Sequence, residues 1–522
     1  MAPSKRRRSK AATKVHASSS QPEANGVPPG PTTTSAEDTN VESVISASIN
    51  AASGGGVRLT RSSSLDGYVS EGGDRKSEGK GKRKRIFIAR DSILTALCRD
   101  DPNFRSLYHA FMVMVVTAIL YSMLKDSVEA ASPHIDFRMF TSGFGPPHQS
   151  LIMLLVWTPL QMAALLVYPA FKVWEWAHPR FGRVADSAAI VMMIAYNFLA
   201  HCVVVASIVH LDLPSIPSVV IALEQLRFSL KSYSFIRENG VKVLRPWSKD
   251  DEDGPHIWYG GQMEVTVGSF SKYLYFLLAP TLIYRDNYPR IPRVRPLRVL
   301  SHFIKCCISL AFVSIIVKEV FGASFTQDWQ LLAKMFLSCM LWGLILQFMA
   351  GYFFLHCWSN LFGELLRFAD RQFYSDWWTC NSFSQFYRKW NLLVHDWIKA
   401  YVYQDLKNKF KNPVFNKMAF VPCILMSAIY HEYVLWAPLR FVLPVLLLQY
   451  STFGLLLFAL KPSSHSSWNY LIHVGLQVGV SLMVFCYVME FNARITCPKE
   501  ENAVNTFVPR FLECYFKNLT KS

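Results

Sequence analysis

The sequence contains repeated blocks of about twenty apolar residues, and these blocks constrain its fold more than any other feature. An α-helix of roughly that length crosses the ~30 Å hydrocarbon core of a bilayer. Hydrophobic residues make up 51% of the 522 residues and charged residues only 17%, which is too apolar for two or three soluble domains. The chain is therefore predicted to be an all-α, polytopic membrane protein.

Nine membrane spans are predicted from these blocks. They lie near residues 107–124, 150–171, 187–209, 215–236, 300–320, 330–357, 417–436, 441–460 and 468–490. The fourth span is the least apolar, because Glu224, Arg227 and Lys231 interrupt it. These three residues are three and four positions apart and can share one helix face, which we expect to face protein or water rather than lipid.

The first 85 residues have the composition of a disordered tail. They are polar, basic and rich in Ser, Gly and Pro, so we expect no cleavable signal peptide. Through Arg90 the chain carries 16 basic and 8 acidic residues, and beside a membrane domain this charge favours attraction to anionic headgroups over nucleic-acid binding. Arg61 lies three residues before Ser64, so Ser64 is either a kinase site or a solvated linker serine.

The next segment, residues 86–106, is expected to form a surface helix beside the membrane, because its apolar and charged residues alternate. It precedes a membrane domain of residues 107–490. The loop of residues 237–298 carries ten Lys or Arg, and residues 367–417 are similarly basic. Basic loops stay on the cytosolic side, which predicts a cytosolic N-terminus and, after nine spans, a lumenal tail of residues 491–522.

Two features of this tail agree with a lumenal position. Cys497 and Cys514 can form a disulfide only in an oxidising compartment, and Asn518 in "NLT" is a possible glycosylation site. Most other cysteines are isolated within apolar segments, and no Cys/His spacing suggests zinc. We therefore expect no metal site.

A histidine and a glutamate lie inside one of the apolar blocks. His431 and Glu432 fall in the middle of the span 417–436, where a charge costs about 2.5 kcal/mol or more. His431 is either a packed histidine or a functional one, and the residues alone leave both readings open. A neutral imidazole there can act as a general base on a buried hydroxyl. Glu432 is expected to face protein, either hydrogen-bonded or protonated.

Aromatic and polar residues crowd the segment 373–397, in a loop predicted to be cytosolic. Asn391 and His395 are four residues apart within a pattern of helical spacing, so we expect them to point the same way from one helix. This helix is either part of a site or an interfacial amphipathic helix with an aromatic belt. The neighbouring basic residues suit lipid headgroups and a polyphosphate substrate equally.

Several motifs, in this order along the chain, resemble the membrane-bound O-acyltransferases that esterify sterols or diacylglycerol. "FADRQFYSDWWT" resembles their FYxDWWN motif, and "HEY" at residues 431–433 matches their intramembrane histidine. "EQLRFSLKSYSFIREN", "FLLAPTLIYRDNYPR", "WNLLVHDW" and "CPKEENAVNTFVPR" are similar to the sterol O-acyltransferase branch in particular. The resemblance runs from about Arg85 to the C-terminus.

The resemblance implies about nine transmembrane helices that enclose a reaction chamber, with amphipathic helices on the cytosolic side. It implies an endoplasmic-reticulum enzyme that transfers a long-chain acyl group from acyl-CoA to the 3β-hydroxyl of a sterol such as cholesterol, without a further cofactor, and that forms a homo-dimer or tetramer. His431 would be the catalytic histidine and Asn391 its partner. The residues that would bind acyl-CoA are Phe373, Tyr374, Asp376, Trp377, Trp378, Tyr387, Arg388, Trp390, Tyr403 and Ser427.

Two departures from the family pattern keep alternatives open. Thr379 replaces the final Asn of the motif, which puts the role of that position in doubt, and "APLRF" at residues 437–441 looks more like the diacylglycerol branch. A diacylglycerol O-acyltransferase is therefore the main alternative. A transporter that uses His431 as a proton relay is more remote, because the sequence has no internal repeat.

Overall fold

The structure is a computed structural model of the chain. It describes residues 68–69, 84–129, 142–244, 256–259, 262–265, 268–322, 326, 328–410, 412–459, 467–498 and 506–519. All of these belong to one unit, residues 63–522, and residues 1–62 lie outside the described residues. Ser64 and most of the predicted basic tail also lie outside them.

Seven helices of the described chain are long and apolar enough to cross a membrane. They are Pro102–Lys125 within α3 (Pro102–Glu129), α5 (Pro147–Phe181), α6 (Arg183–His210), α9 (Pro296–Phe321), Trp329–Leu365, Pro413–Leu439 and α19 (Ser467–Thr496). The fifth comprises α10 (Trp329–Gly351), the π-helix η2 (Tyr352–Trp358) and α11 (Ser359–Leu365), and the sixth comprises α15 (Pro413–Lys417) and α16 (Phe420–Leu439). The predicted helical membrane architecture is confirmed, but the count of nine is not.

The two remaining predicted spans differ from the other seven. α7 (Ser215–Leu244) is a continuous helix, but its charged residues make it less apolar. The predicted span 441–460 is divided into α17 (Val445–Gln449), the π-helix η5 (Tyr450–Gly454) and α18 (Leu455–Ala459). Only Val445–Leu457 of this segment forms an apolar helix, and it is shorter than the seven long ones.

The charged face of α7 packs against protein, as predicted. The ammonium group of Lys231 donates hydrogen bonds to the carbonyl oxygens of Phe276, Leu277 and Ala279, at 2.7, 3.0 and 2.6 Å. These carbonyls lie at the C-terminal end of α8 (Phe270–Leu278), where a helix has unsatisfied acceptors and a partial negative charge. The buried Lys231 therefore caps α8 and fixes it against α7.

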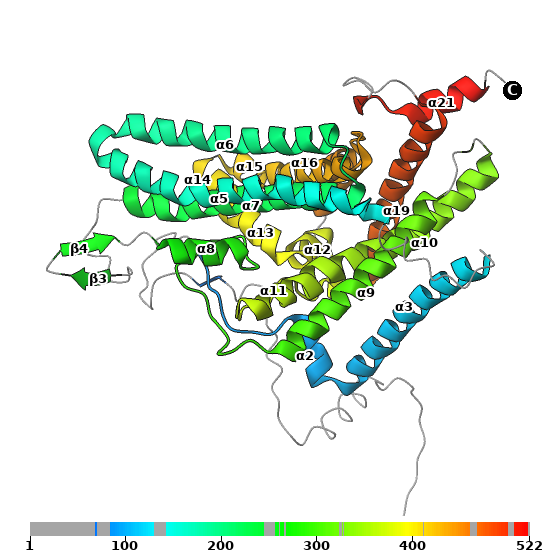
Figure 1. The fold of residues 1–522 in the computed structure, drawn as a ribbon, viewed down its shortest axis with the longest axis horizontal. Helices are drawn as coiled ribbons and strands as arrows, with labels where there is room; N and C mark the ends of the chain where they lie inside the picture. The colour runs from blue at the N-terminus through cyan, green and yellow to red at the C-terminus, as the bar shows by residue number, and fades with distance from the viewer. Residues whose placement is uncertain are drawn as a thin grey trace, which may run out of the picture. The chain divides into compact units, whose positions relative to one another are not determined.

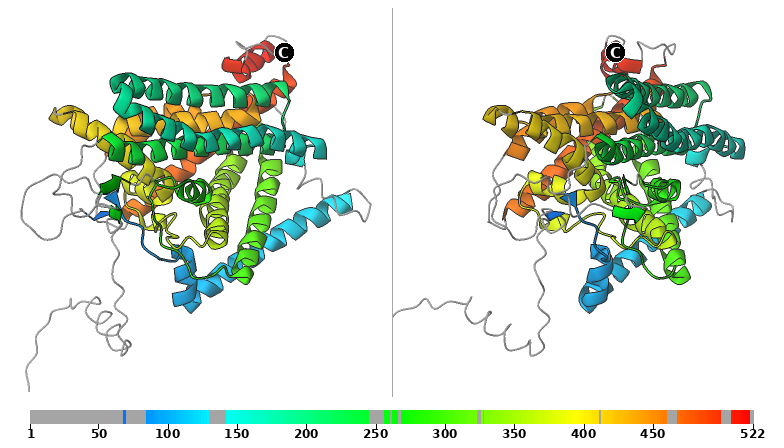
Figure 2. Two further views of the ribbon diagram at one scale, coloured as in Figure 1. Left: turned by 60° about the vertical axis from the view of Figure 1, so that its left-hand side comes forward. Right: turned by 90° about the vertical axis from the view of Figure 1, so that its left-hand side faces the viewer.

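The long helices pack in two groups. α5, α6, α7 and α16 run side by side (Figures 1 and 2), and their shared core includes Leu160, Ile208, Phe228 and Ala437. α9, α10 and α19 pack around a second core that includes Ile316, Cys339 and Val488, and α3 contacts this group through α9. The two groups support the shorter helices that carry most of the predicted site.

The shorter elements lie between and around the long helices. They are the strands β1 (Tyr68–Val69), β2 (Lys84–Arg85), β3 (His256–Tyr259) and β4 (Gln262–Val265), the 3-10 helices η1 (Ser142–Phe144) and η3 (Trp377–Thr379), and the helices α2 (Ile93–Asp100), α12 (Phe383–Trp390), α13 (Leu392–Ile398), η4 (Lys399–Tyr403), α14 (Gln404–Lys409) and α21 (Arg510–Leu519). β1 pairs with β2 and β3 with β4, both antiparallel.

The segment before α3 is helical over only part of its predicted length. Residues 93–100 form α2, but residues 86–92 are extended. Arg90 makes a parallel β-bridge with Asp370, so this stretch takes its hydrogen bonds from another segment instead of from a helix. Ile86 and Ile88 are exposed while Phe87 between them is half-buried, which is the period of two that an extended chain gives. The prediction of a surface helix was therefore wrong for residues 86–92.

Candidate active site

His431 lies on α16 with its ring tied to the helix backbone. Its Nδ1 lies 2.7 Å from the carbonyl oxygen of Ser427, one helical turn earlier. Because a carbonyl oxygen only accepts hydrogen bonds, Nδ1 carries the proton, and in the neutral ring the lone pair is on Nε2. The side chain of His431 is exposed, so Nε2 is accessible to a hydroxyl group. This arrangement can perform general-base chemistry.

Glu432, the next residue, faces protein as predicted. One carboxylate oxygen accepts hydrogen bonds from the backbone N–H groups of Leu446 and Leu447, at 2.7 and 3.2 Å. The other accepts one from the hydroxyl group of Tyr487 on α19. Leu446 and Leu447 lie in the first turn of α17, where the N–H groups of a helix have no partner within it. Glu432 thus joins α16 to α17 and α19 beside His431.

Tyr450 connects His431 to the predicted acyl-CoA residues. Its ring centroid lies 6.3 Å from that of His431 and 5.9 Å from that of Tyr387 on α12. His431 and Tyr387, which lie in different helices, are therefore both in ring contact with one tyrosine.

Aromatic contacts continue from Tyr387 into the predicted motif. The Phe386 ring stacks on Trp390 at 5.4 Å, and Trp390 meets Trp377 edge to face at 4.9 Å. Trp390 also presses against Gly351, where a Cβ atom would come within 2.7 Å of the indole ring. A side chain at residue 351 would displace this tryptophan.

Backbone hydrogen bonds fix residues 373–378, which we call the FYSDWW segment, against α12 and α13. The Ser375 N–H group donates to the Lys389 carbonyl at 2.9 Å, and the Leu392 N–H group donates to the Phe373 carbonyl at 3.0 Å. Phe373 is fully buried. The Tyr374 hydroxyl group lies 3.0 Å from Nδ1 of the buried His356, so it anchors this side of the segment to η2.

Asp376 is held in its charged form by three donors. Ser375 and Thr379 donate to its carboxylate oxygens at 2.7 and 2.8 Å, and the ammonium group of Lys389 lies 3.0 Å away. Burial raises the pKa of Asp376, but these hydrogen bonds outweigh burial and the pKa lies below its ordinary value. Thr379 occupies the position of the family's asparagine, and here its hydroxyl group donates a hydrogen bond to Asp376.

Asn391 does not lie within a helix, so the predicted continuous helix through Asn391 and His395 was wrong. α12 ends at Trp390 and α13 begins at Leu392, because Asn391 is extended and its side-chain oxygen accepts a hydrogen bond from the Val394 N–H group at 3.2 Å. Asparagine is a favoured N-cap residue for this reason. His395 instead contacts the Asp396 carboxylate at 3.2 Å, and burial together with nearby Lys399 lowers its pKa to about 3.

The remaining predicted residues lie around this assembly. Arg388 is exposed and folds back on Ser384, donating to its carbonyl and hydroxyl oxygens at 2.9 and 2.8 Å. Tyr403 belongs to η4, which packs against α16, and its ring lies under the ammonium group of Lys407. Within the described residues, no hydrogen bond, ion pair or ring contact joins Asn391, Arg388 or Tyr403 directly to His431.

Comparison with known proteins places the chain in a family. The membrane-bound O-acyltransferase family model matches residues 266–489. Mouse sterol O-acyltransferase 2 is 33% identical over 453 residues, which cover 83% of this chain and 81% of that protein. Mouse sterol O-acyltransferase 1 is 31% identical over 88% and 85% of the two chains, and human sterol O-acyltransferase 2 is 32% identical over 83% and 81%. The chain belongs to the membrane-bound O-acyltransferase family.

The acyltransferase holds its FYSDWW segment with residues that the sequence did not single out. Asn469 on α19 donates to the carbonyl oxygens of Trp378 and Cys380, at 2.8 and 2.9 Å. His473, one turn later, contacts the Trp378 carbonyl at 3.2 Å. Asn469 and His473 are four residues apart on a predicted span. This spacing indicates that they share one helix face, and it is the only sequence feature that could have identified them as a pair. Tyr450 carried no such signal, because only the fold brings it to His431.

In the C-terminal tail of the acyltransferase, Cys497 and Cys514 form a disulfide with a Cα–Cα distance of 6.0 Å. The bridge connects the end of α19 to α21. Glu490 of α19 also accepts hydrogen bonds from the N–H groups of Arg510 and Phe511, at the start of α21. Asn518 lies on α21, and its side chain is outside the described residues.

Proposed function

We propose that this acyltransferase transfers a long-chain acyl group from acyl-CoA to the 3β-hydroxyl of a sterol, with His431 as the general base. The observation that carries the proposal is the position of His431: Nδ1 is held by Ser427, and the ring is one tyrosine away from Tyr387 of the acyl-CoA residues. The similarity to sterol O-acyltransferases over most of the chain supports the sterol acceptor.

In this mechanism the reaction is a direct transfer. Nε2 of His431 takes the proton of the sterol hydroxyl while the hydroxyl oxygen attacks the thioester carbonyl. The C–S bond then breaks, and the departing thiolate takes the proton from the imidazolium to give CoA. The side-chain oxygen of Asn391 is engaged by Val394, so its amide N–H groups are the ones that can donate to the developing oxyanion.

Two further aspects belong to the proposal. The enzyme lies in the endoplasmic-reticulum membrane with its N-terminus in the cytosol and its C-terminus in the lumen, and the Cys497–Cys514 disulfide supports an oxidising environment for the tail. It acts as a homo-oligomer, and acyl-CoA enters from the cytosol while the sterol arrives from the bilayer.

The acceptor is tested with purified enzyme. Radiolabelled acyl-CoA is offered with cholesterol and, in parallel, with diacylglycerol, and the lipid products are separated. We expect labelled steryl ester and little triacylglycerol. Predominant triacylglycerol would show that the acceptor is diacylglycerol instead of a sterol. It would not affect the assignment of His431 as the general base. Proton uptake by reconstituted vesicles without any ester would contradict the reaction itself.

A further inference from the structure

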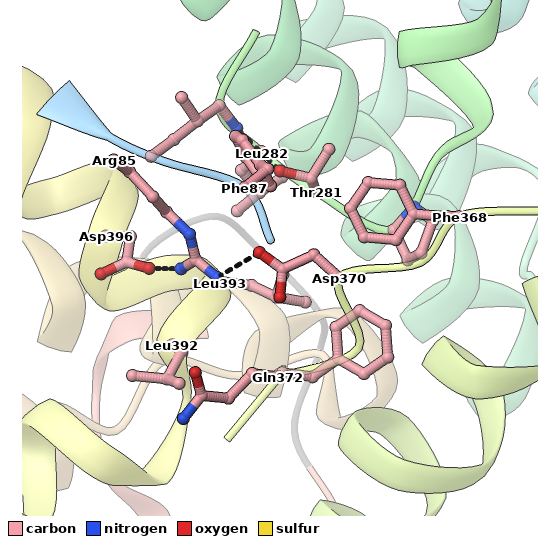
Figure 3. A pocket seen from close by; sticks show the side chains of 13 residues that line it. Arg85, Phe87, Thr281, Leu282, Phe368, Asp370, Gln372, Leu392, Leu393 and Asp396 are labelled. Atoms are coloured by element: carbon pink, nitrogen blue, oxygen red, sulfur yellow. Dashed lines mark hydrogen bonds and ion pairs between the residues drawn. The ribbon is translucent and has the colours of Figure 1, made fainter. Parts of the chain in front are cut away.

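An N-terminal segment reaches the acyl-CoA site although no motif assigns it a role. Residues 84–92, which we call the N-terminal strap, run extended from β2 to α2. Figure 3 shows the side chain of Arg85 pointing between two carboxylates, Asp370 on one side and Asp396 on the other.

Arg85 forms ion pairs with both carboxylates in a buried setting. Its guanidinium lies 3.5 Å from Asp370 and in direct contact with Asp396. The side chains are 9%, 0% and 6% exposed, respectively, so bulk water screens these pairs little. The adjoining cavity measures about 10 Å³, the space of about one water molecule. The two carboxylates could not be rehydrated without movement of the surrounding chain.

Each carboxylate belongs to a segment that carries predicted site residues. Asp370 lies three residues before Phe373, where the FYSDWW segment begins. Asp396 lies on α13, whose N-cap is Asn391. One guanidinium therefore joins the segment proposed to bind acyl-CoA to the helix that Asn391 begins.

The rest of the strap holds Arg85 in place. The Arg90 N–H group donates to the Ala369 carbonyl, and the Arg371 N–H group donates to the Arg90 carbonyl, both at 3.0 Å. Arg90 also forms an ion pair with the other oxygen of Asp370, at 2.7 Å. The ring of Phe87 packs edge to face on Tyr288, with centroids 5.1 Å apart.

We propose that Arg85 is a positioning residue for acyl-CoA, because it holds the FYSDWW segment and α13 at a fixed separation. The proposal rests on the assignment of acyl-CoA to these segments. Without Arg85, Asp396 and Asp370 are buried near each other with one cation fewer, and two close carboxylates repel. The segments then move apart, and a displacement of about 1 Å at a binding site can cost up to about a hundredfold in catalysis.

The test measures acyl-CoA affinity in the purified, full-length enzyme. KM for a long-chain acyl-CoA is measured at saturating acceptor, and binding of a radiolabelled, non-hydrolysable acyl-CoA analogue is measured separately, without acceptor. For Arg85→Met we expect KM and the analogue Kd to rise, and kcat/KM to fall by about tenfold to a hundredfold. Arg85→Lys, which keeps the charge but not the two-pronged geometry, is expected to fall in between.

A second variant separates positioning from folding. In Arg85→Met/Asp396→Asn, one of the two buried carboxylates is neutral, so we expect the analogue Kd to recover part of the loss. Arg99→Met is the matched control, since Arg99 pairs with Asp91 and Asp100 at the surface and should leave the Kd unchanged. Trp377→Ala, within the FYSDWW segment, should raise the Kd.

The outcomes distinguish the positioning role of Arg85 from the assignment of acyl-CoA binding to the FYSDWW segment. If Trp377→Ala weakens analogue binding but Arg85→Met and Arg85→Lys leave it unchanged, Arg85 has no positioning role. If Arg85→Met lowers only the yield of folded enzyme, with unchanged KM in the folded fraction, its role is merely structural and the proposal fails. If Trp377→Ala also leaves binding unchanged, the acyl-CoA assignment of the segment is wrong.

Discussion

Replacing Glu432 tests whether its hydrogen bonds hold α16, the helix that carries His431, in place. In Glu432→Ala, the N–H groups of Leu446 and Leu447 lose their carboxylate acceptor. Each buried donor left without a partner costs about 1–3 kcal/mol, so the two together predict a loss of about 2–6 kcal/mol in the free energy of unfolding. The Tyr487 hydroxyl adds little to this loss of stability, because it can donate instead to the Leu443 carbonyl, 3.0 Å away.

The conservative variant should behave differently. Glu432→Gln keeps one oxygen to accept from the two N–H groups and loses only the charge, so we expect a loss of about 1 kcal/mol. Tyr487→Phe removes the third hydrogen bond and should cost a similar amount, and the double variant should cost less than the sum of the two, because the residues are in contact.

The assay is thermal unfolding of purified enzyme in detergent or nanodiscs, followed by tryptophan fluorescence, with turnover measured on the same samples. We expect Glu432→Ala to lower both the unfolding temperature and kcat, and Glu432→Gln to lower each only slightly. Equal stability of the Ala variant and the wild type would refute the reasoning. So would strict additivity of Glu432→Gln and Tyr487→Phe.

Three further predictions follow from the same structure. Gly351→Ala should reduce turnover with little loss of folded protein, because its methyl group would come within 2.7 Å of Trp390; unchanged turnover would contradict this. Removing the Cys497–Cys514 bridge, which spans 17 residues, should lower stability by about 3 kcal/mol in the tail, and a reductant should change the wild type but not Cys497→Ser. Burial lowers the pKa of His395 to about 3 from 6.5. The stability that the neutral side chain contributes is therefore present above pH 6.5 and is lost as the pH falls towards 3. Thermal unfolding of His395→Gln should show a flatter pH dependence between these two pH values.

Much of the fold followed from local chemistry in the sequence. The spacing of Glu224, Arg227 and Lys231 predicted a face turned to protein or water rather than lipid, and Lys231 is buried against the end of α8. The cost of a charge at membrane depth predicted that Glu432 faces protein, and it does. These predictions succeeded because an unsatisfied charge is expensive wherever the chain places it.

Other features depended on partners that the sequence does not identify. Residues 86–92 alternate in a way that suits both a surface helix and an extended chain, and the bridge to Asp370 decides between them. Helical spacing around Asn391 predicted one helix, whereas the side chain of Asn391 caps a new one. Tyr450, whose ring centroid lies 6.3 Å from that of His431, belongs to a π-helical turn where a straight span was predicted. A contact with another segment decided the first case, a local side-chain cap the second, and a π-helical turn the third.

The most direct test of the central claim is the turnover of His431→Ala in purified, correctly folded enzyme with acyl-CoA and a sterol acceptor. Loss of a general base lowers the rate by about a hundredfold to ten-thousandfold, and we expect a loss in this range with unchanged membrane insertion and nearly unchanged binding of the acyl-CoA analogue. His210→Ala, an exposed histidine at the end of α6, should retain full activity. Near-normal ester formation by His431→Ala would contradict the assignment of His431 as the base.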